Sequence, residues 1–154
     1  MTIRNLDALF RPASIALIGA SNKRGSIGAI LARNLLGGDY KGRVWPVNPS
    51  HRRIRGAKVY RDLEQLPQTP DLGVICTPPE AVPPLIAELG RRGARAAVIV
   101  TAGFAEAREA RGGALQAQLV EAARAHGLRV VGPNCVGVLV PGIGLNASFA
   151  HRPA

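Results

Sequence analysis

The chain has 154 residues, of which 47% are apolar, so it is long and apolar enough for one folded domain and is not a disordered tail. Twenty Lys and Arg against ten Asp and Glu give a net charge of +10, which attracts phosphorylated small molecules, nucleic acid or anionic membranes. An aromatic content of 4% disfavours a surface that stacks single-stranded bases. The sequence has no apolar run near the ~20 residues of a membrane helix, no export signal and no C-x-x-C pair, which predicts a cytoplasmic protein without a membrane partner.

Strands and helices alternate along the sequence. Short apolar runs bounded by glycine or proline predict strands buried on both faces. These runs are residues 14–20, 43–47, 72–77, 96–101 and 129–131. Helical spacing and stop signals predict helices at residues 27–36, from the Pro78–Pro79 pair to about residue 89, and at 114–126. The polar stretch 50–70 predicts turns, with one helical turn around 62–66 and an extended piece at 58–60.

This alternation predicts a Rossmann-like, doubly wound α/β fold with a mainly parallel five-stranded sheet and helices on both faces. Ligands of such sheets bind beyond the carboxyl ends of the strands. Functional residues are therefore expected just after each strand. Those segments are residues 21–28, 48–53, 77–80, 102–106 and 132–135.

The first of these segments, in "GASNKRGSIG" (residues 19–28), has the form of a phosphate-binding turn. Gly19 allows a sharp turn after the strand, and Gly25 and Gly28 allow close backbone approach to a ligand. The following helix offers free N–H groups and a partial positive charge to an anion. Donors and cations in the same turn are Ser21, Asn22, Lys23, Arg24 and Ser26. The alternative interpretation is a plain strand–helix turn, since such turns favour glycine and serine in any case.

The end of the second strand argues against NAD. An NAD site places an acid there for the ribose hydroxyls, whereas this sequence has "VNPSHRRIR" (residues 47–55). The neutral Asn48 and Ser50 with the basic Arg52 and its neighbours suit a phosphorylated ribose, as in NADP or coenzyme A. The alternative is an exposed, solvated basic loop with no ligand.

Catalytic and metal-binding patterns are absent from the sequence. The three histidines, His51, His126 and His151, form no Ser/His/Asp set, and no metal-ligand spacing occurs. Cys76 at a strand end is expected to be buried, and Cys135 has no base that the sequence can assign. Glu106 is expected to start a helix, and His126 to end one.

Five stretches in order carry a resemblance to a known family. They are "GASNKRGSIG", "PVNPS", "LEQLPQTPDLGVICTPPEAV", "TAGFAE" and "GPNCVGVLVPGIGLNASF". Together they resemble the coenzyme-A-binding domain of NDP-forming acyl-CoA synthetases, the superfamily of the succinyl-CoA synthetase alpha chain. The resemblance covers essentially the whole chain, and the ordered set is far more specific than any one motif.

Within the superfamily, two groups share these motifs. The stretches "ALFRPASIALIGAS", "RNLLGG", "LPQTPDLGVICT" and "GLNASF" look most like the amino-terminal region of bacterial Pat-type protein lysine acetyltransferases, in which a synthetase-like region is joined to a GNAT domain. ADP-forming acetate–CoA ligases share most of them. Both parents stay open at this point.

The resemblance implies a set of coenzyme-binding residues. They are Ser21, Asn22, Lys23, Arg24, Gly25, Ser26, Ile27, Asn48, Pro49, Ser50, Arg52, Thr77, Pro78, Thr101, Ala102 and Gly103. Many relatives have Asn-Pro-Lys where this chain has Asn48-Pro49-Ser50, so Arg52 or Arg53 would have to replace the lysine. The implied ligand is coenzyme A, acetyl-CoA or another acyl-CoA, and no catalytic or metal residue is implied.

The resemblance also implies a division of the chain. Residues 1–132 would form the coenzyme-A-binding domain, and residues 133–154 the junction and truncated start of a ligase-type domain. The family's phosphohistidine lies in that next domain, and His151 does not match its motif. We therefore expect a fragment that binds coenzyme A without completing a turnover, its further domains being missing. An NADP-binding domain of an oxidoreductase is the alternative, and a nucleic-acid binder ranks last because the cations are otherwise scattered.

Overall fold

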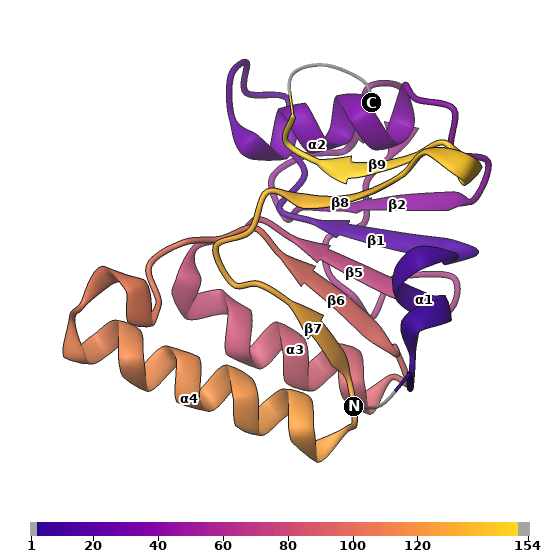
Figure 1. Ribbon diagram of the computed structural model, residues 1–154. Helices are drawn as coiled ribbons and strands as arrows, with labels where there is room; N and C mark the ends of the chain where they lie inside the picture. Colours follow the sequence, from indigo (N-terminus) through magenta and orange to yellow (C-terminus); the bar gives the residue numbers. More distant parts are fainter. Residues whose placement is uncertain (1–2, 151–154) are drawn as a thin grey trace.

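Five parallel strands form the centre of the computed structural model, which describes residues 3–150 (Figure 1). The strand order is β2-β1-β5-β6-β7, so the chain winds outward from β1 in both directions. The strands are β1 (Ser14–Ile18), β2 (Arg43–Val47), β5 (Leu72–Ile75), β6 (Ala96–Ile99) and β7 (Arg129–Val131). The predicted Rossmann-like fold is confirmed, although β1, β5 and β6 end two residues earlier than predicted.

The three central strands are buried along their whole length because layers cover both faces of the sheet. On one face pack α1 (Leu6–Phe10), α2 (Ile27–Leu36) and a carboxy-terminal hairpin, around Leu17 and Leu31. On the other face pack α3 (Val82–Arg91) and α4 (Ala110–Ala125), around Ile75 and Ile86. Figure 1 shows α2 with the hairpin on one side of the sheet and α3 with α4 on the other.

Two helices differ from the sequence prediction. The short α1 was not predicted, although its Ala8 and Leu9 are fully buried. Helix α4 begins at Ala110 and not at 114, so the pair Gly112–Gly113 lies inside it. Gly112 is tolerated there because its missing side chain lets α4 approach the Phe104 carbonyl, which a Cβ atom would overlap. None of the helices in the described part of the chain is both long and apolar enough to span a membrane.

Residues 50–70 leave the sheet and return to it. They form a small antiparallel pair, β3 (Arg53–Ile54) with β4 (Ala57–Lys58), and Tyr60 then bridges to Val47. The extended piece predicted at 58–60 is thus present in part. At 62–66, where one helical turn is predicted, a single hydrogen-bonded turn stands and no helix forms: the Leu66 N–H donates to the Leu63 carbonyl (3.3 Å). The Asp62 carboxylate accepts the Gln65 N–H (3.0 Å), which offers the backbone an alternative to helix.

The carboxy-terminal hairpin packs onto α2. Its strands are β8 (Gly137–Val140) and β9 (Leu145–Ser148), joined by the 3₁₀ turn η3 (Pro141–Ile143). Val138, Leu145 and Ala147 belong to the same core as α2, and the Asn34 amide donates to the Ser148 carbonyl (2.8 Å). The predicted boundary at residues 132 and 133 stays a prediction, and His151 lies outside the described residues.

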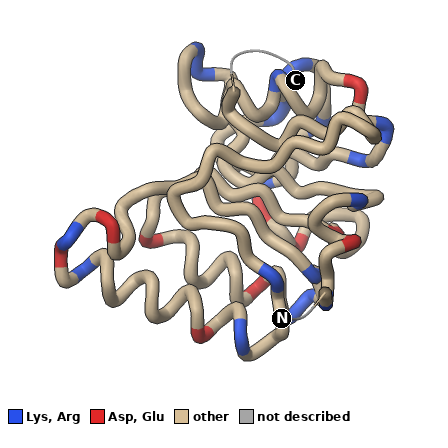
Figure 2. Tube along the Cα trace, viewed as in Figure 1, with Lys and Arg blue, Asp and Glu red and all other residues tan. Residues whose placement is uncertain are grey.

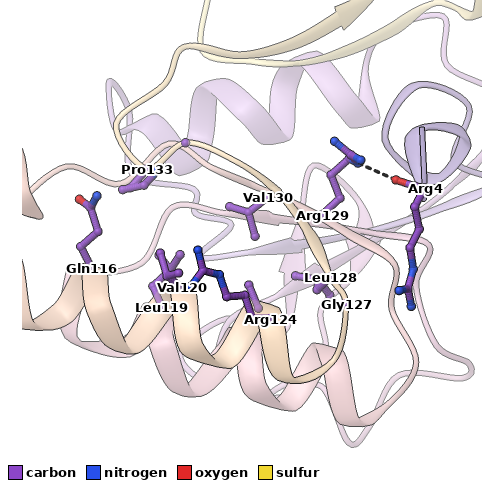
Figure 3. Close-up of a pocket in the computed structure, with 12 residues that line it drawn as sticks. Arg4, Gln116, Leu119, Val120, Arg124, Gly127, Leu128, Arg129, Val130 and Pro133 are labelled. Atoms are coloured by element: carbon purple, nitrogen blue, oxygen red, sulfur yellow. Dashed lines mark hydrogen bonds between the residues drawn. The ribbon is translucent and has the colours of Figure 1, made fainter. Parts of the chain in front are cut away.

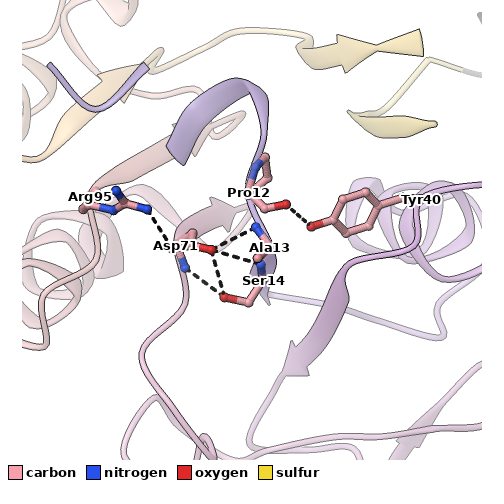
Figure 4. Close-up of polar contacts among 6 residues, drawn as sticks. All are labelled: Pro12, Ala13, Ser14, Tyr40, Asp71 and Arg95. Carbon is pink, nitrogen blue, oxygen red and sulfur yellow. Dashed lines mark hydrogen bonds and ion pairs between the residues drawn. The ribbon is translucent and has the colours of Figure 1, made fainter. Parts of the chain in front are cut away.

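The amino-terminal edge of the sheet is held by Asp71 (Figure 4). Its carboxylate accepts the N–H of Ala13 (2.9 Å) and of Ser14 (3.2 Å) and pairs with Arg95 (3.0 Å). Partial burial raises the pKa of Asp71, but these hydrogen bonds and the Arg95 charge outweigh it and lower that pKa below its ordinary value. Beside them the Tyr40 hydroxyl donates to the Pro12 carbonyl (2.7 Å). This network is structural and lies at the edge opposite the candidate site.

Candidate functional site

The turn after β1 is built by two glycines that touch. Gly19 has φ +94°, a conformation that residues with a side chain rarely adopt. Gly28, in the first turn of α2, lies so close to the Gly19 carbonyl that a Cβ atom would overlap it. The amino terminus of α2 is therefore held directly over the end of β1, where its unpaired first-turn amides face the carboxyl edge of the sheet.

The loop between these glycines is shaped by its own serines. The Ser21 hydroxyl accepts the Lys23 N–H (2.9 Å), and the Ser26 hydroxyl donates to the Lys23 carbonyl (2.7 Å) and accepts the Ala29 N–H (3.2 Å) as the helix cap. The Ser26 hydrogen is thus used inside the loop, so the prediction that Ser26 donates to a ligand does not fit this geometry. Ser21 keeps its hydrogen for a ligand.

Cations remain on the outside of this loop. Lys23, Arg24 and Gly25 are exposed, and Gly25 has φ +80° with open space around it. Figure 2 shows Lys and Arg on the loop before α2, and other cations at both edges of the sheet. A helix amino terminus with two free-standing cations is an arrangement that stabilises bound phosphate.

Two asparagines join this loop to the end of β2. The Asn48 amide donates to the Ala20 carbonyl (2.8 Å) and its oxygen accepts the Ser50 N–H (2.7 Å). The Asn22 amide donates to the Arg53 carbonyl (2.9 Å). These predicted site residues hold the loops in place rather than presenting both of their polar groups to a ligand.

The two candidate replacements for the family's lysine differ in availability. The Arg53 guanidinium donates to the Gly56 carbonyl (2.9 Å) within its own hairpin. The Arg52 side chain is exposed and makes no hydrogen bond or ion pair within residues 3–150. Arg52 is therefore the better placed of the two for an anion.

A cavity of about 560 Å³ opens between the ends of β1, β2 and β5. Six of the predicted site residues line it: Ser21, Asn48, Pro49, Ser50, Thr77 and Pro78. The other predicted residues do not line it: residues 22–27 belong to the glycine loop, Arg52 to the β2–β3 connection and residues 101–103 to the loop after β6.

The sequence did not reveal part of this cavity. Its lining also includes Arg61, Asp62, Leu63, Ala81, Leu85 and Glu88. No acid directly follows β2, as the sequence indicates, but the return of the chain beside Val47 brings Asp62 into the same cavity. Asp62 is therefore an acid of the cavity that comes from a loop further along the chain and not from the end of β2. The spacing of Ala81, Leu85 and Glu88, by four and then three residues, is a signal that could have been found.

The loop after β6 is tied to the loop after β5. The Thr101 hydroxyl donates to the Thr77 carbonyl (2.7 Å). The Glu106 carboxylate accepts the N–H of Gly103 (2.7 Å) and of Phe104 (3.2 Å), and these hydrogen bonds lower the pKa of Glu106. Glu106 lies in the first turn of the 3₁₀ helix η2 (Ala105–Ala107), as expected for a helix-initiating acid.

Neither cysteine is activated as a nucleophile. Burial raises the pKa of the Cys76 thiol to about 12, and that thiol contacts the Ile18 carbonyl (3.4 Å). Burial also raises the pKa of the half-buried Cys135. No cluster of metal-ligating side chains occurs among the residues that the structure describes. The site can therefore bind and orient a ligand but offers no attacking thiolate.

A second cavity of about 540 Å³ lies between α4 and β7 (Figure 3). Leu119, Val120 and Leu128 line it, and the Arg129 guanidinium donates to the Arg4 carbonyl at its rim (2.6 Å). It contains none of the predicted site residues and lies apart from the glycine loop.

The parallel sheet, its winding about β1 and the glycine turn beneath a helix amino terminus define the class of Rossmann-like α/β domains. Within that class, the chain belongs to the CoA binding domain family, which it matches over residues 13–141.

Similar proteins support this assignment. The chain is 40% identical, over 94% of its length, to the alpha subunit of acetate–CoA ligase [ADP-forming] I from Pyrococcus furiosus, and spans 32% of that subunit. It is 38% identical, over 95% of its length, to the acetate–CoA ligase [ADP-forming] I of Archaeoglobus fulgidus, of which it spans 21%.

Solved structures agree. The dinucleotide-forming acetyl-coenzyme A synthetase 1 of Ca. Korarchaeum cryptofilum, in complex with phosphate and ADP, superimposes with a TM-score of 0.86 at 38% identity, over 94% of this chain and 30% of that one. The protein PH0766 of Pyrococcus horikoshii OT3 gives 0.87 at 39% identity, over 94% and 33%. The chain thus spans a third or less of the proteins it matches.

Proposed function

We propose that this chain is the coenzyme-A-binding part of an ADP-forming acid–CoA ligase and that it holds coenzyme A, or its thioester, along the carboxyl edge of the sheet. The observation that carries the proposal is the glycine loop beneath the amino terminus of α2, with Lys23 and Arg24 exposed on it. Membership of the CoA binding domain family supports coenzyme A as the phosphorylated ligand.

The phosphates are assigned to the loop of residues 21–27. Free first-turn amides, the helix dipole and two cations favour several negative charges close together, as in the pyrophosphate and 3′-phosphate of coenzyme A. Arg52 takes the role of the lysine that many relatives have after Asn-Pro, since Arg53 is engaged within its hairpin. Pro49 and Ser50 line the cavity beside the loop.

The pantetheine arm is assigned to the loops after β5 and β6. Thr77 and Pro78 line one side, and residues 101–103 continue the same edge through the Thr101–Thr77 hydrogen bond. The arm is largely apolar with amide groups, so exposed backbone and small side chains suit it. Ala102 is exposed, and Gly103 has φ +102°, which keeps the turn close to Pro79.

The chemistry of this chain is binding and positioning. Both thiols stay protonated at neutral pH because burial raises their pKa values, so neither competes with the coenzyme thiol as a nucleophile. The acid that is activated and the nucleotide used belong to the proposed whole ligase. A cytoplasmic location of that ligase is part of the same proposal.

A second candidate for the larger protein to which this chain belongs is a lysine acetyltransferase of the Pat type, favoured by the stretches "ALFRPASIALIGAS" and "GLNASF". In either protein this chain would bind coenzyme A or acyl-CoA. Reading the gene that encodes the chain decides between them: a GNAT domain in the same protein supports the acetyltransferase, and an ATP-grasp domain supports the ligase.

The test is a titration of the 154-residue chain with coenzyme A, acetyl-CoA, NADP and ATP at one ionic strength. At 100 times the dissociation constant, a true ligand adds about 2.7 kcal/mol to the free energy of unfolding. Coenzyme A or acetyl-CoA is expected to raise the melting temperature most. A clear preference for NADP, or no shift with either CoA species, contradicts the proposal.

A further inference from the structure

The cavity beside the glycine loop has two ends of different chemistry. Its upper end lies at the sheet edge, next to the cationic loop, and is lined by Ser21, Asn48 and Ser50. From there it runs along α3. The middle is apolar, lined by Ile18, Val47, Leu63, Ala81 and Leu85, of which the first three are nearly fully buried.

Two carboxylates stand at the lower end. Helix α3 and the turn before it present Ala81, Leu85 and Glu88 on one face, so Glu88 lies two helical turns below the sheet edge. Asp62 reaches the same lining from the loop after β4. One Asp62 oxygen accepts the Gln65 N–H, which leaves the other oxygen for a ligand.

Glu88 has no structural partner that explains it. Within residues 3–150 its carboxylate forms no hydrogen bond or ion pair, and Arg92, one turn further along α3, makes no ion pair with it. Glu88 is partly buried and belongs to the lining of the cavity. Arg61 also lines the cavity but is exposed, so solvent screens its charge.

This arrangement fits a purine base with an exocyclic amine. The apolar middle suits a flat ring, and a volume of about 560 Å³ is within the range of small-ligand sites. The lower end repels phosphate, so the phosphates stay at the cationic loop and the base takes the acidic end. An ionised carboxylate only accepts hydrogen bonds, and adenine offers a donor at N6 where hypoxanthine and guanine have a carbonyl oxygen.

We propose that Glu88, with Asp62 beside it, accepts hydrogen bonds from the N6 amino group of the adenine of coenzyme A and thereby excludes 6-oxo purines. This inference rests on the proposed binding of coenzyme A and adds Glu88 as the residue that selects the base. Held in the same pose, with position 6 against the carboxylate, a 6-oxo purine would bring its carbonyl oxygen to a group that has no hydrogen to donate, which leaves both oxygens unpaired.

Isothermal titration with two ligands tests the inference. The ligands are coenzyme A and its analogue with hypoxanthine in place of adenine. The wild-type chain is expected to bind coenzyme A roughly tenfold or more tighter, the usual range for one well-placed base contact. In Glu88→Gln the ratio is expected to fall below about threefold, because an amide both donates and accepts and so tolerates either base.

Two further variants sharpen the experiment. Asp62→Asn keeps the turn cap, since Asn caps as well as Asp, and is expected to lower the ratio less than Glu88→Gln. Glu64→Gln removes an exposed carboxylate of the same segment that does not line the cavity, and its ratio is expected to stay at the wild-type value.

Each outcome is decisive. A wild-type ratio near one, or an unchanged ratio in Glu88→Gln, overturns the inference while tight binding of coenzyme A leaves the proposed function standing. Absence of binding of either ligand to the folded wild-type chain overturns the proposed function itself.

Discussion

Gly28 lies against the carbonyl of Gly19, with no room for a Cβ atom between α2 and the end of β1. This contact sets the height of the α2 amino terminus above the sheet edge. The loop that connects the two glycines then has to bulge outward, which exposes Lys23 and Arg24.

Gly28→Ala is therefore expected to lower the free energy of unfolding by about 1–3 kcal/mol, because α2 must move away from the sheet. The matched control is Gly113→Ala in α4, where a Cβ atom would meet nothing within 4 Å. That change is expected to stabilise the chain by up to about 1 kcal/mol, since alanine favours a helix. Urea unfolding of both variants checks this, and an equal effect of the two would contradict the close contact.

Arg24→Glu is expected to weaken coenzyme A binding by about tenfold, because a cation near phosphate is replaced by an anion. Arg91→Glu makes the same charge change at the carboxy terminus of α3, near the opposite edge of the sheet, and is expected to leave binding within about twofold. Arg111 is a poorer control because it pairs with Glu80. Titration calorimetry at fixed salt compares the two, and equal losses would mean that net charge, not the loop, attracts the ligand.

Glu106→Ala is expected to release the turn at Gly103 and Phe104, whose N–H groups both donate to the carboxylate. Amide hydrogen exchange at these two positions should accelerate, while Glu109→Ala, whose side chain caps nothing, should leave them unchanged. Because the same hydrogen bonds lower the pKa of Glu106 below its ordinary 4.5, the protection at these amides should persist at pH 4.5 and be lost only at lower pH.

The chain should lose stability in alkali. Burial raises the pKa of Cys76 from 9.0 to about 12, and burial together with the Asp71 charge raises that of Tyr40 from 10.0 to about 12. Both groups hold their protons more tightly when folded, so their contribution is complete below pH 9 and is lost as the pH rises towards 12.

Chemical unfolding between pH 8 and 12 measures this loss. Each proton should contribute up to about 1.4 kcal/mol per pH unit. Tyr40→Phe removes one of the two groups, so its stability should fall less steeply above pH 10 than that of the wild type. Identical slopes would show that the phenol does not ionise on unfolding in this range.

The sequence predicts the strands well because short apolar runs bounded by glycine or proline are typical of strands buried on both faces of a sheet. It also predicts the glycine loop, since the roles of Gly19 and Gly28 follow from local backbone geometry. The residue spacing alone is compatible with both NADP and coenzyme A. The choice of coenzyme A comes from the family resemblance.

What the sequence does not predict depends on long-range packing. The return of residues 60–63 to the end of β2 is set by the Val47–Tyr60 bridge, which has no local signal. Hydrogen-bond direction is equally hidden: Ser26 was expected to face a ligand, yet its hydroxyl caps α2. Glu88 was overlooked because it lies in a helix, away from the strand ends where ligand contacts are expected.

The loops of the site are bonded to one another in series. Asn48 joins the end of β2 to Ala20, Thr101 joins the end of β6 to Thr77, and the Asn134 N–H donates to the Thr101 carbonyl (2.9 Å). The backbone of these loops is therefore already ordered before a ligand binds at this edge of the sheet. The conformational entropy of these loops is lost when the chain folds rather than when it binds, so most of each new contact counts toward affinity.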